Sequence, residues 1–222
     1  MNATRRPRVK ICCIGSREDA ALAIECGASA LGLVSQMPSG PGVIRDELIA
    51  EIAATVPPAI GTFLLTCRQS AQDIVSQQRS CGTNTIQICD HLTTGTHRDV
   101  KAALPGISVV QVIHVTGPES VEEAVRIAPH VDAILLDSGN QKLQVKELGG
   151  TGRTHDWNLS RQIREQIPVP LFLAGGLTPD NVAQAIAEVR PYGLDLCSGV
   201  RTNGKLDADK LIRFFASVAA AA

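Results

Sequence analysis

The sequence predicts a (β/α)8 barrel, a closed ring of eight parallel strands surrounded by helices. Short apolar runs rich in β-branched residues alternate with helix-patterned segments along the chain, and this alternation is typical of a parallel sheet. Eight strand–helix pairs fit within 222 residues, a length at which α/β barrels commonly form one unit. No low-complexity linker divides the chain, so residues 1–222 are predicted to form one domain. A doubly wound open sheet is the alternative, but eight pairs without a second domain favour closure.

The predicted strands are the apolar runs at residues 9–14, 30–34, 60–65, 85–89, 108–114, 132–136, 170–173 and 193–197. The predicted helices follow them, at residues 16–26, 45–54, 70–77, 97–103, 120–128, 159–166, 179–189 and 207–220. Start signals support several of these helices. Ser16 precedes two acidic residues, Ser120 opens the run SVEEAV, and Thr178 is followed by a proline and an aspartate. Asp156 is the predicted N-cap of the helix at 159–166.

Composition excludes several classes of function. The net charge is −1 with no long run of one sign, which indicates neither a nucleic-acid partner nor a membrane surface. No apolar run reaches the length of a membrane span. Seven cysteines without a CxxC motif, in a chain too long to depend on disulfides, predict reduced thiols and a cytoplasmic location. Nothing in the sequence predicts an oligomeric state.

In a barrel of this kind, the chemistry lies at the carboxyl ends of the strands. The polar residues predicted there are Cys12, Cys13, Ser35, Thr66, Cys89, Asp90, His91, His114 and Asp137. Adjacent residues on a strand point to opposite faces, so we expect one thiol of the Cys12-Cys13 pair to face the barrel mouth. The same argument makes Cys89-Asp90-His91 a poor metal site, because neighbours at a strand end diverge. No metal site is predicted.

Small residues follow the last two predicted strands. Gly175-Gly176 comes after one apolar run and Ser198-Gly199 after the next. Turns without bulky side chains let backbone N–H groups approach an anion, and a following helix N-terminus favours its negative charge. Tight turns alone would also explain these glycines, but two consecutive strands with the same ending favour a phosphate site. The expected ligand is therefore a phosphorylated small molecule.

Several longer motifs resemble the phosphoribosylanthranilate isomerase family of tryptophan biosynthesis. The segments that carry the resemblance are KIC at 10–12, GASALGLV at 27–34, LLD at 135–137, GGTGRTHDW at 149–157, LAGGLTPDNVAQAI at 173–186 and RPYGLDLCSGV at 190–200. The similarity spans nearly the whole chain and is most specific from residue 132 onward. It implies a (β/α)8 barrel that catalyses an Amadori rearrangement without a cofactor.

The resemblance also implies roles for individual residues. It makes Cys12 the general base and Asp137 the general acid, and it places the substrate phosphate on Gly175, Gly176, Ser198 and Gly199. It further points to Gln87, His114, Gly150 and Arg153 as substrate-binding residues. An ordinary thiol, with a pKa of about 8.5, is mostly protonated at neutral pH. This chemistry therefore needs an unusually acidic thiol and a partly buried, weakly acidic carboxyl group across one cavity.

The first half of the chain departs from the family pattern. Cys13 stands where the family usually has glycine, and the arginine expected after the second strand is absent until Arg45. His114 replaces another arginine, at the end of the fifth strand. Both arginines would face the carboxylate of the aromatic ring. We therefore expect Arg68, Arg153 or His114 to take over that contact.

Two other functions remain open on the sequence. The chain could be a divergent isomerase or lyase that acts on another sugar phosphate, with the same phosphate site and acid–base pair. It could also be a non-catalytic barrel that binds a phosphorylated ligand.

Overall fold

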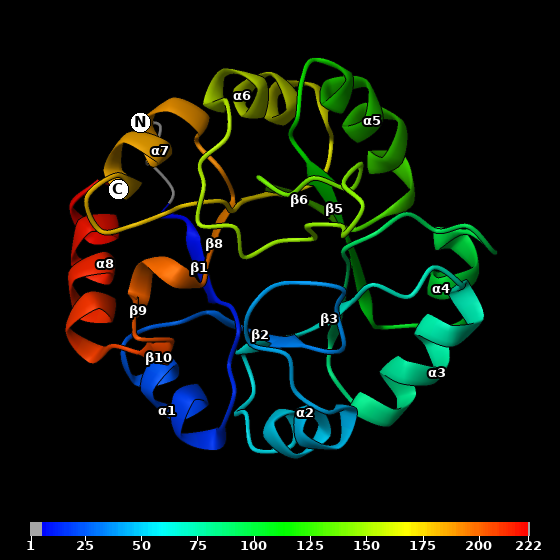
Figure 1. Ribbon diagram of the computed structural model, residues 1–222, viewed down its shortest axis with the longest axis horizontal. Coiled ribbons are helices and arrows are strands. Elements are labelled where there is room, and N and C mark those ends of the chain that lie inside the picture. The colour runs from blue at the N-terminus through cyan, green and yellow to red at the C-terminus, as the bar shows by residue number, and fades with distance from the viewer. Residues whose placement is uncertain (1–5, 222) are drawn as a thin grey trace.

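The computed structural model describes residues 6–221, which form a closed eight-stranded parallel barrel (Figure 1). Each strand pairs with the next along the chain, and β8 closes the ring against β1. The barrel strands are β1 (Arg8–Ile11), β2 (Ala30–Val34), β3 (Gly61–Thr66), β4 (Thr85–Ile88), β5 (Ser108–His114), β6 (Ala133–Asp137), β7 (Leu171–Leu173) and β8 (Gly193–Leu196). The predicted fold class is confirmed. The predicted domain covered 1–222, and residues 1–5 and 222 lie outside the described part.

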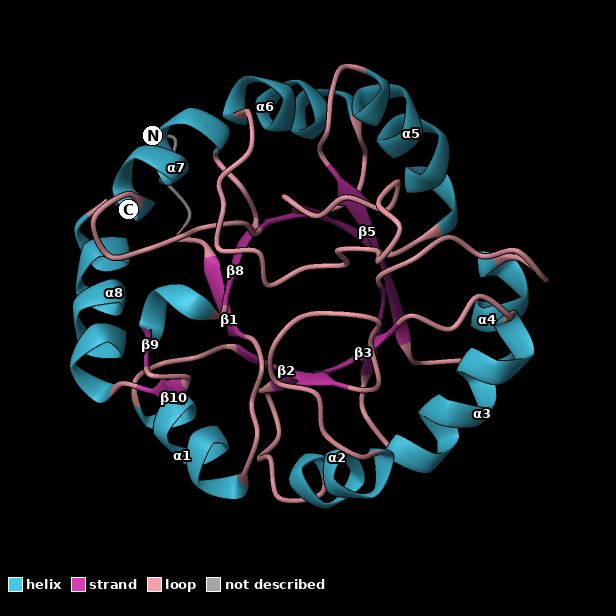
Figure 2. Cartoon of the chain, in the orientation of Figure 1, coloured by secondary structure: helices cyan, strands magenta, loops and turns pink. Residues whose placement is uncertain are grey.

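The helices surround the strands, as Figure 2 shows. They are α1 (Arg17–Glu25), α2 (Asp46–Ala53), α3 (Ala71–Cys81), α4 (His97–Ala103), α5 (Glu119–Ile127), α6 (Trp157–Gln166), α7 (Val182–Val189) and α8 (Ala208–Ala220). The predicted caps at Ser16 and Asp156 are confirmed, because the first side chain accepts from Asp19 N–H and the second from Asn158 N–H. No helix in the described part of the chain is long and apolar enough to cross a membrane.

Alternation along the strands divides the buried residues into two clusters. One lies between the strands and the helices, and the other fills the barrel interior with residues that include Phe63, Val112, Leu135 and Phe172. Phe63 and Phe172 meet edge to face with ring centroids 5.9 Å apart. Cys12 belongs to the interior cluster. The strand register therefore decides which face is inward, a point that the sequence left open.

Three predicted boundaries were wrong for local reasons. β1 ends at Ile11 rather than at residue 14, because Cys13 has a φ of +61°, which a strand does not allow. α7 begins at Val182 rather than at residue 179, since Thr178 N–H donates to Asn181 Oδ1 at 2.8 Å within a turn. Ser120 lies inside α5, which has Pro118 at its N-cap.

Two further features escaped prediction. α3 continues to Cys81 and ends on Gly82, which adopts the left-handed conformation typical of a helix end. Two short antiparallel strands, β9 (Arg201–Thr202) and β10 (Lys205–Leu206), follow the 3₁₀ helix η2 (Ser198–Val200). They fix the position of Arg201 beside the barrel mouth.

Candidate active site

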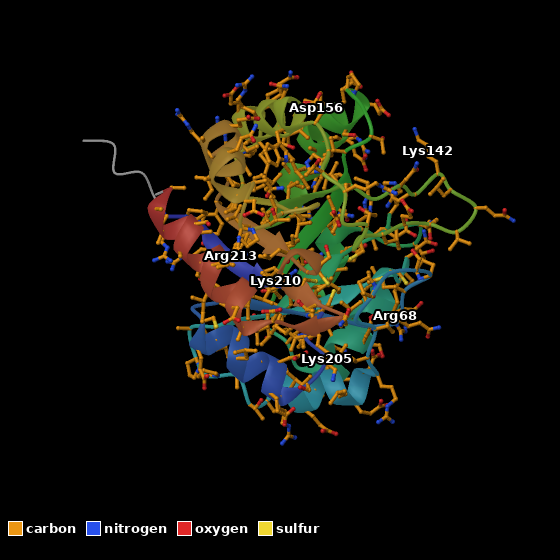
Figure 3. All side chains as sticks on the ribbon, turned by 60° about the vertical axis from the view of Figure 1, so that its left-hand side comes forward. Arg68, Lys142, Asp156, Lys205, Lys210 and Arg213 are labelled. Atoms are coloured by element: carbon orange, nitrogen blue, oxygen red, sulfur yellow. The ribbon has the colours of Figure 1, made fainter. Side chains whose placement is uncertain are left out.

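A cavity opens at the carboxyl ends of the strands. Its walls come from the ends of β1, β2, β3, β4, β6, β7 and β8 and from the loops after β2 and β6. These two loops cross the barrel opening in Figure 2. Ser39 Oγ donates to the Lys146 carbonyl at 2.7 Å, so the loops are tied together beside the cavity. Farther along the β6–α6 loop, Lys142 extends away from the body of the barrel (Figure 3).

Cys12 lies directly beyond β1, buried, with its N–H donating to the Leu196 carbonyl at 2.9 Å. Beneath it is an ion pair between Lys10 Nζ and Asp195 Oδ1, 2.9 Å apart. A Cβ at Gly32 would lie 2.9 Å from Cys12 Sγ and 3.0 Å from Lys10 Nζ. A glycine at this position of β2 therefore leaves room for the thiol and the ammonium group to share the barrel interior.

Lys10 is fully buried and also lies 5.2 Å from the centroid of the Phe63 ring. Burial opposes its charge, but attraction to Asp195 and then to an anionic Cys12 raises the Lys10 pKa above its ordinary value. Burial likewise raises the pKa of Asp195, and Lys10 opposes that shift. The site thus keeps a charged ammonium group next to the Cys12 thiol.

Asp137 is the last residue of β6, with 9% of its surface exposed. Its Oδ1 accepts from Ser138 N–H at 2.7 Å. A Cβ at Gly149 would lie 2.8 Å from Oδ2, so the backbone of the β6–α6 loop covers the carboxyl group. Burial and then the negative charge at Cys12 raise the pKa of the nearby Cys89 thiol, and Asp137 acts in the same direction. Cys12, Cys89 and Asp137 therefore line one cavity.

Cys13 lines the same cavity as Cys12. The prediction that adjacent cysteines would face opposite ways was wrong, because the left-handed conformation at Cys13 takes it out of the strand. Arg201 Nη2 donates to the Cys12 carbonyl at 2.9 Å and to the Cys13 carbonyl at 2.6 Å. Lys210, on α8 (Figure 3), donates in turn to the Arg201 carbonyl at 2.7 Å. Arg201 thus holds the backbone on which Cys12 is presented.

The four predicted phosphate-binding residues lie on two turns in contact. Gly175 and Gly176 have φ values of +84° and +61°. A Cβ at Gly199 would collide with the Leu177 carbonyl oxygen, and one at Gly152 would lie 3.5 Å from Ser198 Oγ. The turn after β7, the turn after β8 and the β6–α6 loop therefore meet beside the cavity. Gly175, Gly176 and Ser198 line it directly.

The four predicted substrate-binding residues are more dispersed. Gln87 and Gly150 line the cavity. His114 Nε2 lies 3.0 Å from the Cys89 carbonyl oxygen, and its ring is covered by the loop at Gly139. Arg153 forms an ion pair with Glu147 on the exposed side of the same loop. Among the described residues that line the cavity, none is a lysine, an arginine or a histidine.

Cys89, Asp90 and His91 diverge, as predicted. Cys89 faces the cavity, His91 Nδ1 lies 3.5 Å from Glu123 Oε1, and Asp90 Oδ2 lies 2.6 Å from Lys146 Nζ. Within residues 6–221, no group of three or more cysteine, histidine or acidic side chains is arranged to hold a metal ion.

The sequence did not single out Lys10, Asp195 or Arg201. A signal for the first two existed, because each is a charged residue inside an otherwise apolar predicted strand. Their pairing follows from the register, which sets Lys10 opposite Asp195. Arg201 offered no such signal, since its role depends on the β9–β10 hairpin.

The fold and the cavity define a (β/α)8-barrel protein with the layout of an enzyme, in which polar groups gather at the carboxyl ends of the strands. Comparison with known proteins narrows this class. Residues 9–217 match the family model described as N-(5'phosphoribosyl)anthranilate (PRA) isomerase. The chain therefore belongs to the N-(5'-phosphoribosyl)anthranilate isomerase family, and it is an isomerase.

Individual relatives agree with this assignment. N-(5'-phosphoribosyl)anthranilate isomerase 2 of Methanosarcina mazei is 35% identical over 93% of this chain and 92% of that protein. The isomerase of Haloferax volcanii is 35% identical over 96% of this chain and 92% of its own length. The crystal structure of the isomerase from Thermotoga maritima matches with a TM-score of 0.81 and 29% identity, covering 96% of this chain and 99% of that one.

One similar structure contains a ligand. It is a phosphoribosyl anthranilate isomerase in complex with reduced 1-(o-carboxyphenylamino)-1-deoxyribulose 5-phosphate. The TM-score is 0.78 at 28% identity, and the match covers 96% of this chain and 99% of that chain.

Proposed function

We propose that this protein rearranges N-(5′-phosphoribosyl)anthranilate to 1-(o-carboxyphenylamino)-1-deoxyribulose 5-phosphate, without a cofactor. One observation carries the proposal: in a chain of this isomerase family, Cys12, Asp137 and the Gly175–Gly176 turn line a single cavity. Cys12 acts as the general base and Asp137 as the general acid. The reaction needs a reduced thiol at Cys12, which accords with a cytoplasmic location.

The phosphate end of the substrate is bound by backbone. Gly175 and Gly176, with Ser198 and Gly199, present main-chain N–H groups from two neighbouring turns. Such groups bind phosphate oxygens without needing a positively charged side chain. This supports a phosphate site in a cavity whose described lining carries no cation.

The chemistry begins with the closed ribose ring. Asp137 donates its proton to the ring oxygen as the C1′–O bond breaks, which gives a protonated Schiff base between C1′ and the anthranilate nitrogen. Cys12 then removes the proton from C2′, and the electron pair of that C–H bond forms an enolamine. Return of a proton to C1′ and loss of the C2′ hydroxyl proton give the ketone. The product is therefore an isomer of the substrate, with no net gain or loss of protons or electrons.

Lys10 supplies the positive charge that stabilises a Cys12 thiolate in the buried interior of the barrel. A thiolate in a poorly solvated interior is unstable unless a positive charge lies nearby. Lys10 is fully buried, and its raised pKa keeps it protonated while Cys12 gains and loses its proton. Asp195 balances that ammonium group when the thiol is neutral.

The anthranilate ring fits the apolar side of the cavity, where Met37, Leu65 and Leu148 lie. Met37 and Leu148 also border an adjoining groove that contains Arg68 and Lys146. Arg68 Nη2 lies 3.8 Å from Asp46 Oδ2, a separation that leaves its guanidinium available to a second carboxylate. Of the three candidates from the sequence, Arg68 is therefore the one that the groove favours for the anthranilate carboxylate.

The absence of a cation from the described cavity lining favours one alternative, an isomerase acting on a different sugar phosphate. A substrate without an aromatic carboxylate would not need Arg68. Thermal stabilisation by simple pentose phosphates, with none by the anthranilate adduct or its product analogue, would support this alternative.

The test is turnover by the purified protein. N-(5′-phosphoribosyl)anthranilate should be consumed at a rate proportional to enzyme concentration, measured as a change in anthranilate fluorescence. Cys26→Ala is a matched control, because this thiol lies at the end of α1 outside the cavity, and its activity should equal that of the wild type. Folded protein with no turnover above the uncatalysed rate would reject the proposal.

A further inference from the structure

Three thiols meet at the junction of β1 and β8. The last register pair joins Ile11 to Leu196, and the Cys12 N–H bonds to the Leu196 carbonyl. Cys12 and Cys197 are therefore the next residues on neighbouring strand ends. Cys13 follows at once, and all three line the cavity. The mechanism above uses only Cys12.

We propose that Cys197 and Cys13 form a peroxide-sensitive pair, in which Cys197 is oxidised and Cys13 captures it as a disulfide. Cys197 is partly exposed and Cys13 is buried, and both line the cavity. A thiol that a small oxidant can reach, with a second thiol beside it, is the arrangement that supports reversible oxidation.

The surroundings of Cys197 favour its reactive form. Hydrogen bonding by the Cys13 thiol lowers the pKa of Cys197, and the Arg201 guanidinium lowers it further, while burial opposes both. Burial raises the pKa of Cys67 and of Cys26, which are also partly exposed. Because the thiolate is the form that reacts with peroxide, Cys197 should react before these two thiols.

The chemistry has two balanced steps. The Cys197 thiolate attacks one oxygen of hydrogen peroxide, the O–O bond breaks, and the released hydroxide takes up a proton to leave as water. Sulfur loses two electrons to the peroxide and becomes a sulfenic acid. The Cys13 sulfur then attacks the Cys197 sulfur, the S–S bond forms, and the sulfenic hydroxyl leaves with the Cys13 proton as a second water.

The disulfide would join the end of β1 to the end of β8. It would connect the residue after Cys12 to the residue before Ser198, across the space between the proposed base and the phosphate turns. If the proposed function holds, this bond stops turnover until a thiol reductant cleaves it.

Peptide mapping after peroxide treatment tests the pair directly. The wild-type protein is exposed to hydrogen peroxide, alkylated and digested with trypsin. A disulfide-linked peptide should join residues 11–17 to residues 165–201, and dithiothreitol should abolish it. The linked peptide should be lost in Cys197→Ser and in Cys13→Gly, where glycine fits the left-handed φ, and it should persist in Cys12→Ala.

Two other mapping results would contradict a Cys13–Cys197 disulfide. A linked peptide that persists in Cys13→Gly would show that Cys12 is the partner. Oxidation of Cys26 or Cys67 before Cys197 would show that no pair is poised at this site. Mapping does not depend on turnover, so its failure is distinguishable from failure of the proposed reaction. Where the enzyme is active, peroxide should abolish its turnover reversibly, and Cys13→Gly should resist that loss.

Discussion

Lys10 shows how much one side chain determines at this site. It is charged, fully buried, paired with Asp195 and adjacent to the Cys12 thiol. A buried ion pair is weak support for stability, but removal of one partner leaves an uncompensated charge and costs about 3–5 kcal/mol. The residue therefore connects the stability of the barrel interior to the chemistry at its mouth.

Replacement of Lys10 tests this connection through pH. In Lys10→Met, Asp195 loses the charge that opposes its upward pKa shift, so its folded-state pKa rises further above the usual value near 3.8. A carboxyl group with a raised pKa favours the folded state below its unfolded pKa and loses that contribution as pH rises through the folded value. The free energy of unfolding lost by Lys10→Met should therefore be larger at pH 8 than at pH 5, measured by urea denaturation. An equal loss at both pH values would contradict the pairing.

For individual residues, the sequence indicated which side chains matter but not which way they face. It identified Cys12 and Asp137 from a family motif, and the strand register then placed both on the cavity. It misjudged Cys13, because a φ of +61° at a cysteine is a feature of the backbone that alternation does not reveal. The partners of His114 and Arg153 depend on the path of the β6–α6 loop, which periodicity does not describe.

Among the elements, the turn after β7 depends closely on the glycines in its backbone. Gly176 has a φ of +61°, and a Cβ there would lie 2.8 Å from both the Arg153 carbonyl carbon and the Thr154 nitrogen. A side chain would therefore push the β6–α6 loop away from the turn. Gly82, at the end of α3, has a φ of +65° with nothing within 4 Å of an added Cβ.

These two glycines form a matched pair for mutation. Gly176→Ala and Gly82→Ala both place a side chain in the left-handed region, at a cost of about 1–2 kcal/mol each, so both should lower the midpoint of thermal unfolding. Only Gly176→Ala should weaken binding of the product analogue, by about tenfold, which corresponds to about 1.4 kcal/mol. Calorimetric titration measures both affinities. Equal affinities in the two variants would argue against a phosphate on this turn.

Some features of the helices and strands could be predicted from the sequence, and others could not. Strands and helices follow hydrophobic periodicity, and the sequence located all eight pairs of the barrel to within a few residues. The predicted helix at 70–77 stopped four residues short of the end of α3, where Gln78 and Arg79 interrupt the apolar pattern. Gln77 and Gln78 are both buried, and Gln77 bonds to the Thr66 hydroxyl at 2.7 Å and to the Asp46 carboxylate at 3.1 Å. Such satisfied polar contacts appear only once the elements are packed.

Across the whole molecule, closure of the ring assembles the site. β8 pairs with β1, so Cys12, near the start of the chain, comes next to Asp195 and Arg201, near its end. The long sequence separation makes these contacts invisible to local patterns, although the order of strands and helices predicted the ring itself. The edge-to-face Phe63 and Phe172 rings belong to the cluster that fills the barrel interior.

In the proposed mechanism, Cys12 and Asp137 divide the proton transfers of one isomerisation across this cavity. The most direct test of this division is the kcat of Cys12→Ala and Asp137→Asn on N-(5′-phosphoribosyl)anthranilate, measured beside the affinity of each variant for the reduced product analogue. Loss of a general acid or base should lower kcat by about 10²–10⁴-fold, while the affinity for the analogue stays close to that of the wild type. Turnover in either variant near the wild-type rate, with the protein folded and able to bind the analogue, would contradict the account.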